Sequence, residues 1–187
     1  MSRLIFLDTE YNSAGELAQL AYVLWERGCA RAKNFYFCIS GMDECAKRVN
    51  RLDSDWLREN GMTYAGARDE VLADFSGATL LAHNLNADKR VLERAFGALP
   101  NAYGLCTMYR FARVLKLPGG RPWKMPSLRE LMAHYAVTEE EAAAQMERDF
   151  GCCGAAHDAR WDAEAVRLCV MRAMRRGDCR NLLKEEE

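Results

Sequence analysis

The chain has 187 residues, and its first strand-like stretch is Arg3-Leu4-Ile5-Phe6-Leu7-Asp8-Thr9-Glu10. An apolar run that ends in an acid, as residues 3–8 do, is typical of a buried strand. Asp8 and Glu10 are two positions apart, so on a strand both side chains face the same way. Two carboxylates so close together repel unless something neutralises them. The stretch therefore fits either a cation site or a merely polar strand exit, and alone it favours the polar exit.

Length and composition indicate one globular domain. Half the residues are apolar and 28% are charged, and at ~150 residues per domain the length favours a single domain. We assign it to residues 1–180 and expect residues 181–187 to fray. The net charge of −1 excludes a protein that binds nucleic acid through bulk basic charge. The densest apolar stretch, residues 17–25, is about half a membrane span.

The start of the chain has neither a long apolar core nor a cleavage site, so we expect no secretory signal. The eight cysteines form no CxxC pair that would indicate zinc. We therefore expect a cytoplasmic protein with reduced thiols, not bound to a membrane.

The order of the predicted elements defines the fold class. Three closely spaced strands are followed by alternating helices and strands, which predicts a mixed five-stranded α/β sheet, three strands antiparallel and then parallel ones, flanked by helices. The predicted strands cover residues 3–8, 16–26, 31–39 and 78–82, with a short fifth one ending at Cys106. The predicted helices cover residues 53–59, 64–75, 86–96, 107–117, 127–135, 142–150 and 158–176.

A third acid, Asp88, follows the strand over residues 78–82, in the stretch His83-Asn84-Leu85-Asn86-Ala87-Asp88. It lies near the start of a helix, where an acid also complements the helix dipole. By itself this segment has that simpler explanation.

A histidine and a fourth acid open the last helix. His157 and Asp162 are five residues apart, with His157 in a break and Asp162 in the following helix. Both side chains can therefore face one point. Each residue also has a simpler explanation. His157 can be a loop histidine without a role, and Asp162 can be an acid that complements the helix dipole in the first or second turn.

The order of these motifs closely resembles the DEDDh 3′-5′ exonucleases. These have a ribonuclease-H-like fold and include the proofreading epsilon subunit of bacterial DNA polymerase III, ribonuclease T and oligoribonuclease. The resemblance runs from residue 4 to about residue 175. Three lesser stretches agree, namely Asn60-Gly61-Met62-Thr63, Cys106-Thr107-Met108 with Arg113, and Ser127-Leu128-x2-Leu131.

The resemblance implies a catalytic role for five residues. Four acids would bind two divalent cations, Mg²⁺ or Mn²⁺, and His157 would be the general base. The acids are Asp8, Glu10, Asp88 and Asp162. The implied reaction hydrolyses phosphodiester bonds at the 3′ end of single-stranded DNA or RNA and releases nucleoside 5′-monophosphates.

Substrate contacts are expected around the same motifs. The usual Asp-x-Glu-Thr-Thr-Gly is here Asp-Thr-Glu-Tyr-Asn-Ser, which changes the pocket for the terminal nucleotide. The residues expected to contact substrate are Thr9, Tyr11, Asn12, His83, Asn84, Leu85 and Arg113. Residues 105–129 also hold six basic side chains and no acid, which fits either a single-strand contact or a solvated helix face.

Other functions remain open at this stage. A catalytically silent nucleic-acid- or polymerase-binding module of the same fold is the alternative from another class, and a different metal-dependent phosphohydrolase is a third. DNA and RNA are not distinguished. The resemblance allows a monomer or a homodimer, and we identify no extension for binding a polymerase.

Overall fold

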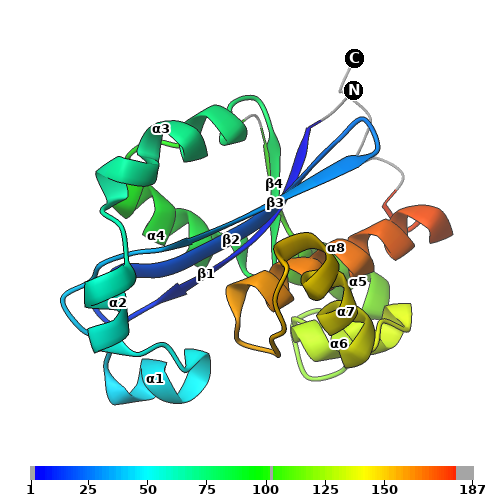
Figure 1. Ribbon diagram of the computed structural model, residues 1–187. Helices are drawn as coiled ribbons and strands as arrows, with labels where there is room; N and C mark the ends of the chain where they lie inside the picture. Colours follow the sequence, from blue (N-terminus) through cyan, green and yellow to red (C-terminus); the bar gives the residue numbers. More distant parts are fainter. Residues whose placement is uncertain (1–2, 102, 180–187) are drawn as a thin grey trace.

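The computed structural model describes residues 3–101 and 103–179, so the tail predicted over 181–187 lies outside the described residues. Its centre is a five-stranded sheet with the order β3-β2-β1-β4-β5 (Figure 1). The strands are β1 (Leu4–Tyr11), β2 (Leu17–Glu26), β3 (Cys29–Tyr36), β4 (Thr79–Ala82) and β5 (Tyr103–Cys106). β1, β2 and β3 pair antiparallel, while β4 and β5 continue parallel to β1. The predicted mixed sheet is confirmed.

Helices cover both faces of the sheet, because β1 is apolar on both sides. Ile5 and Leu7 pack in one apolar cluster, and Leu4 and Phe6 pack in another on the opposite face. The first face is covered by α3 (Tyr64–Phe75) and α4 (Leu85–Phe96). The second is covered by α5 (Thr107–Leu115), α6 (Leu128–Tyr135), α7 (Glu139–Phe150) and α8 (Ala159–Arg176). Figure 1 shows these two layers on either side of the strands.

Several predicted boundaries shift in the structure. β1 continues past Asp8 to Tyr11. β3 starts before the predicted residue 31 and ends at Tyr36. α5 ends at Leu115 because Lys116 adopts a left-handed conformation. The N-cap of α5 is Cys106, and the hydroxyl of Thr107 donates a hydrogen bond to the carbonyl of Ala82 at 3.2 Å. α6 and α7 each begin with a capping box, formed by Ser127 with Glu130 and by Thr138 with Glu141.

One helix was not predicted. α1 (Glu44–Asn50) precedes α2 (Ser54–Asn60), and both lie beside the carboxyl end of β1. Asp43 caps α1 by accepting a hydrogen bond from the amide of Ala46 at 3.0 Å. The helix is short and mostly exposed, so it lacks the apolar periodicity that identifies longer helices.

The cysteines are all free thiols. Cys152 lies 2.8 Å from a donor nitrogen of Arg160, and its neighbour Cys153 is exposed. Within residues 3–101 and 103–179, no helix combines the length and apolar composition that a membrane span requires.

Candidate active site

Three carboxylates meet at the carboxyl end of β1. Strand periodicity continues the series Leu4, Phe6, Asp8 and Glu10 along one face, so the two acids follow directly from the core positions. A bulge after Glu10 ends the regular pairing with β2, and bulges re-aim side chains beside active sites. Asp162, from the first turn of α8, completes the group. One carboxylate oxygen of each residue lies within 4.8 Å of the others.

The start of α8 is held against the sheet by Gln19 of β2. The Gln19 amide nitrogen donates to Asp158 at 3.3 Å, and its oxygen accepts from the backbone of Ala159 at 3.4 Å. Asp158 is also the N-cap of α8. These bonds fix the helical turn that carries Asp162, and Asp162 in turn accepts from the backbone amide of His157 at 3.0 Å.

His157 lies on the loop before α8 with a φ of 68°. A non-glycine residue in this region is uncommon, although histidine adopts it more readily than most. Its side chain is exposed and borders the cleft that also contains Asp8, Glu10 and Asp162. The structure therefore brings the predicted histidine to the predicted acids.

Asp88 lies apart from the three clustered carboxylates. It projects from the first turn of α4 and is only 4% exposed. Its Oδ1 accepts a hydrogen bond from the Thr9 hydroxyl at 2.8 Å. Asp88 is still close enough to contribute to the raised pKa of Asp8 by repulsion.

Burial raises the pKa of all four acids. For Asp8 the pKa lies well above its ordinary value, first because of burial and then because of repulsion from Asp162, Asp88 and Glu10. Burial and nearby acids raise the pKa of Glu10 to about 8. Burial also raises the pKa of Asp88 and of Asp162 to about 7. Carboxyl groups in such surroundings are more stable when they bind protons or cations than when they are ionised without a counter-charge.

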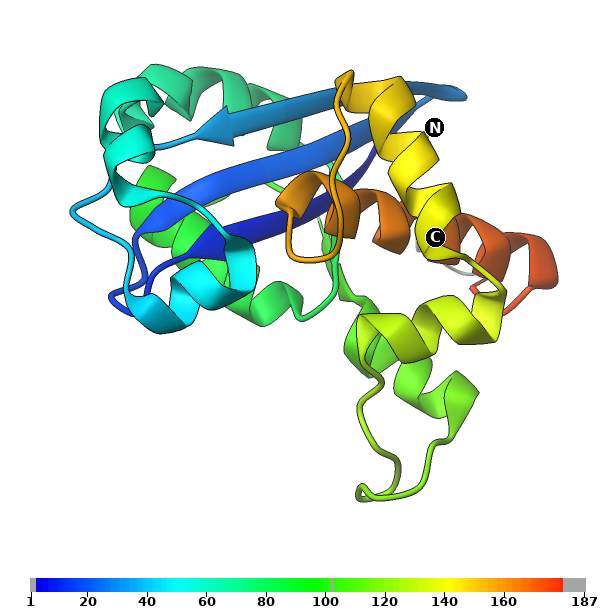
Figure 2. The same ribbon diagram turned by 60° about the horizontal axis from the view of Figure 1, so that its bottom comes forward.

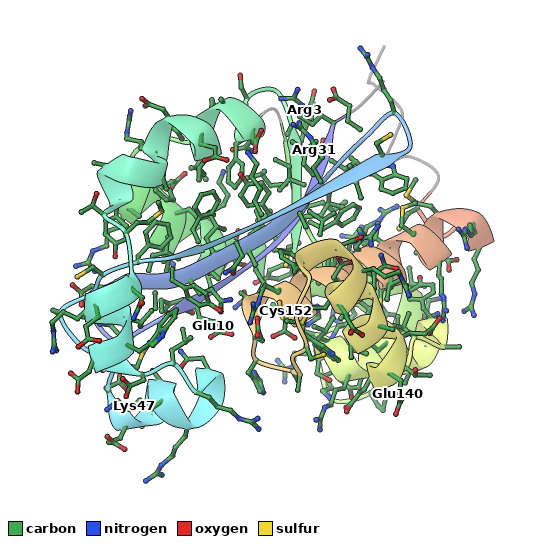
Figure 3. All side chains as sticks on the ribbon, in the orientation of Figure 1. Arg3, Glu10, Arg31, Lys47, Glu140 and Cys152 are labelled. Atoms are coloured by element: carbon green, nitrogen blue, oxygen red, sulfur yellow. The ribbon has the colours of Figure 1, made fainter. Side chains whose placement is uncertain are left out.

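The acids open into a cleft of about 430 Å³ between β1, α1 and the His157 loop. Figure 3 shows Glu10 in the space between α1 and the start of α8. The residues that α1 contributes were missed by the sequence analysis. Among them is Asn50, which lines the cleft with Glu10 and offsets part of the rise in the pKa of that carboxyl. The pair Asp43-Glu44, an N-cap followed by a first-turn acid, is the signal that could have revealed this helix.

The first three predicted substrate residues have different surroundings. Tyr11 is 38% exposed and lines the cleft. The Thr9 hydroxyl is bonded to Asp88. Asn12 is 4% exposed, and its side chain bonds the carbonyl of Gly41 at 2.7 Å and both the amide and the carboxylate of Glu16. Asn12 thus holds the β1–β2 loop in place, and of the three only Tyr11 presents an exposed side chain.

The remaining predicted contacts lie farther along the same edge of the sheet. His83 is half-buried, with Nδ1 3.0 Å from the Thr107 hydroxyl, and burial lowers its pKa. Asn84 is exposed and has a φ of 76°. Leu85 is only 3% exposed and packs in the core, so its side chain is not available for the predicted contact with substrate. Arg113 is exposed on α5 and lines a separate hollow.

The clustered side chains form a ligand set for a hard cation. All the donors are carboxylate oxygens, which Mg²⁺, Mn²⁺ and Ca²⁺ prefer. Burial raises the pKa of each of the three acids, and repulsion from neighbouring acids adds to the rise, so a bound cation would stabilise their charged forms. Asp8, Glu10 and Asp162 therefore fit one divalent ion, whereas Asp88 is bonded to Thr9 outside this group.

Comparison with solved structures identifies the fold. An exonuclease I from Methylocaldum szegediense superposes with a TM-score of 0.64 and 16% identity, over 94% of this chain and 41% of that one. An SSB/exonuclease I structure in complex with an inhibitor gives 0.62 and 14% identity, over 94% and 43%. A full-length 3′-exonuclease gives 0.52 and 12% identity, over 94% and 61%. The chain therefore has the ribonuclease-H-like fold of these exonucleases.

The sequence itself gives no closer assignment. No family model matches the chain, and no curated protein matches it. The chain also spans less than two thirds of the length of each of these three structures.

Proposed function

We propose that this chain is a metal-dependent 3′-5′ exonuclease acting on single-stranded nucleic acid. The observation that carries the proposal is the cluster of Asp8, Glu10 and Asp162 within 4.8 Å, with His157 on the same cleft. Its position on a fold shared with exonucleases supports the same function.

Each acid has a distinct place in the proposed site. Asp162, Asp88 and Glu10 are all close enough to Asp8 to raise its pKa by repulsion, so Asp8 would serve the ligand sets of both cations. Glu10 and Asp162 would complete the ligands of one, and Asp88 would support the other. Two Mg²⁺ or Mn²⁺ ions, when bound, would activate water and relieve charge on the leaving oxygen.

His157 is the proposed general base. Its backbone amide is bonded to Asp162, which positions the residue while the exposed imidazole borders the cleft. A neutral imidazole within reach of a water can accept a proton from it as that water attacks. The ring would take the proton of the attacking water as the phosphodiester bond breaks.

The terminal nucleotide would lie next to Tyr11. Tyr11, Asn12 and Ser13 line both the acidic cleft and a second hollow of about 400 Å³ against α4. Arg90 and Arg94 lie on the wall of that hollow. An exposed aromatic ring next to arginines suits a base and its phosphates.

The test uses matched 5′-labelled single-stranded DNA and RNA, incubated with Mg²⁺ or Mn²⁺, with and without chelator. We expect a chelator-sensitive ladder that shortens from the 3′ end, and the faster polymer identifies the preferred substrate. Asp8→Asn should abolish shortening. His157→Asn should slow it by about 10²–10⁴-fold, and asparagine accepts a positive φ, so the loop should keep its shape.

Glu140→Gln is the matched control, because Glu140 is an exposed acid of α7 outside the residues that line the cleft (Figure 3). It should degrade substrate like the wild type. If the wild type shortens neither polymer with either metal, the exonuclease proposal fails. Retained strand binding in that case would favour the catalytically silent binding module.

A further inference from the structure

Another aromatic and basic hollow lies outside the acidic cleft and apart from the hollow beside Tyr11. We call it the Trp123 hollow. It has a volume of about 360 Å³ and lies between α5 and the loop that leads to α6. Tyr109, Arg113, Trp123 and Met125 are among its lining residues. Tyr109 is 50% exposed and Met125 39%. Large apolar side chains that are exposed together indicate a binding surface rather than core packing.

The loop that carries Trp123 is folded in a defined way. Its ends are joined by a bond of 3.0 Å from the Lys124 amide to the Leu117 carbonyl. A Cβ at Gly120 would lie 2.2 Å from the Trp123 carbonyl oxygen, so only glycine allows the loop to close on itself. Lys124 Nζ also lies 2.5 Å from Glu130 of α6. Figure 2 shows this loop projecting from the body between α5 and α6. These contacts hold the loop in one conformation, so the wall that Trp123 contributes to the hollow has a defined shape.

The charges around the hollow suit a polyanion. Arg110 and Arg113 lie on its wall, and Lys116 Nζ lies 5.8 Å from the centre of the Trp123 ring. No acid is among the lining residues. Within residues 3–101 and 103–179, no carboxylate forms an ion pair with Arg113 or Lys116. Stacking surfaces interleaved with cations are how proteins hold single strands.

The hollow lies along the same edge of the sheet as the acids. β1, β4 and β5 are parallel neighbours, so their carboxyl ends are together, with adjacent strands ~4.8 Å apart. Asp8 and Glu10 are at the end of β1, His83 follows β4, and α5 begins where β5 ends. His83 Nδ1 lies 3.0 Å from the hydroxyl of Thr107, the first residue of α5, and the backbone of Pro126, at the base of the Trp123 loop, is close enough to offset part of the lowering of the His83 pKa by burial. This edge therefore runs from the acidic cleft past His83 to the hollow.

We infer that the Trp123 hollow binds an unpaired base of the nucleic-acid strand, upstream of the bond that is cut, by stacking on Trp123 and Tyr109. Arg113 and Lys116 would contact the adjoining phosphates. This inference rests on the proposed exonuclease function for the direction of the strand. It adds a site that would favour long strands over the shortest ones.

The direct test measures binding of fluorescein-labelled dodecamers of thymidylate and uridylate by anisotropy, in chelator so that nothing is cut. Trp123→Ala should weaken the Kd by about tenfold, the scale of one lost stacking contact. Trp123→Tyr should restore most of the affinity because it keeps a stacking ring. Tyr103→Ala is the control: Tyr103 is 62% exposed but begins β5, at the opposite end of the strand from α5.

A second arm measures kcat/KM on a dinucleotide and on the dodecamer with Mg²⁺ or Mn²⁺. Trp123→Ala should lose about tenfold on the dodecamer and nothing on the dinucleotide. A Kd equal to that of the wild type, or an equal loss on both lengths, overturns the role of the hollow while leaving the exonuclease intact. Failure of the wild type to cut either substrate overturns the exonuclease proposal, and the Kd comparison still decides the hollow. No binding by the wild type overturns both.

Discussion

The Thr9 hydroxyl donates a hydrogen bond of 2.8 Å to Oδ1 of the buried Asp88, linking β1 to α4 directly behind the clustered acids. The bond lowers the pKa of Asp88, which burial otherwise raises. Thr9→Val removes the donor with little change of shape, so we expect the pKa of Asp88 to rise above about 7. Metal-dependent cleavage should then fall at neutral pH and recover partly under alkaline conditions.

The pH–rate profile of Thr9→Val checks this, with Thr9→Ser as the control that keeps the hydroxyl. If the cleavage rate of Thr9→Val falls by the same factor at every pH, the pKa of Asp88 has not changed. Thr9 would then affect cleavage only by stabilising the fold. A serine variant as impaired as the valine variant would show that the methyl group, and not the bond, matters.

Stability without divalent cations should depend on pH in a definite direction. The folded pKa values of Glu10, Asp88 and Asp162 are about 8, 7 and 7, against ~4 in an unfolded chain. Between the unfolded and the folded pKa values, the folded state binds more protons than the unfolded chain. The free energy of unfolding therefore falls as pH rises from about 4 to about 8. Below pH ~4 both states are protonated and this contribution is fully present.

Urea unfolding in chelator across this pH range measures the effect, and Asp88→Asn should flatten the slope. Mg²⁺ or Mn²⁺ should restore stability most at the alkaline end, where the ligands are charged. A metal-free protein that grows steadily more stable from pH 5 to 8 would contradict the raised pKa values.

A close backbone contact at Gly61 explains one of the lesser motifs. A Cβ at this position would lie 2.4 Å from the carbonyl oxygen of Leu57 and 2.5 Å from the amide of Cys38. Gly61→Ala should therefore cost about 1–3 kcal/mol of stability by overpacking. Gly66→Ala is the matched control. Gly66 lies in the first turn of α3, and a Cβ there would be 3.5 Å from Thr63 Oγ1, which is an ordinary van der Waals contact.

Thermal and urea unfolding of the two alanine variants make the comparison. Gly66→Ala should keep or raise stability by ~0.5–1 kcal/mol, because alanine is the better helix former. Equal stability of the two variants would contradict the close packing of Gly61 against the backbone of Phe37 and Cys38, just after β3.

Long periodic segments made the fold predictable, whereas local exceptions did not. β1 and α8 follow from apolar patterns that their burial confirms. α1 escaped prediction because its contacts are few and come from distant parts of the chain, such as the bond of 2.8 Å from the Ser13 amide to Asp43. The seven residues of α1 have no apolar periodicity, so the Asp43-Glu44 pair at its start is the local signal that it offers.

The site could be predicted in part for the same reason. Spacing places Asp8 and Glu10 on one strand face, and the order of motifs supplies Asp162 and His157. At a turn the sequence has no regular periodicity, so it does not predict which side chains are buried. Leu85 and Asn12 therefore looked available for substrate, although one is core and the other bonds the loop around it. Gln19 went unnoticed because a polar residue on a strand normally faces solvent, and here it is 1% exposed.

Gln19 leads to the last prediction. Its amide joins three elements: it donates to Asn34 of β3 at 2.8 Å and to the Asp158 cap at 3.3 Å, and it accepts from the start of α8. Gln19→Leu leaves these partners unsatisfied in a buried place, which costs about 1–3 kcal/mol. The turn carrying His157 and Asp162 would also loosen. We therefore expect kcat to fall while KM changes little.

Asn34→Ala separates the two effects, because it breaks the bond to β3 but leaves the link from Gln19 to α8. It should lower the unfolding free energy with cleavage unchanged. Steady-state cleavage and urea unfolding of both variants provide the comparison. If Gln19→Leu unfolds more easily yet cuts substrate at the wild-type rate, the start of α8 keeps its position without Gln19. The capping by Asp158 alone would then position the turn that carries His157 and Asp162.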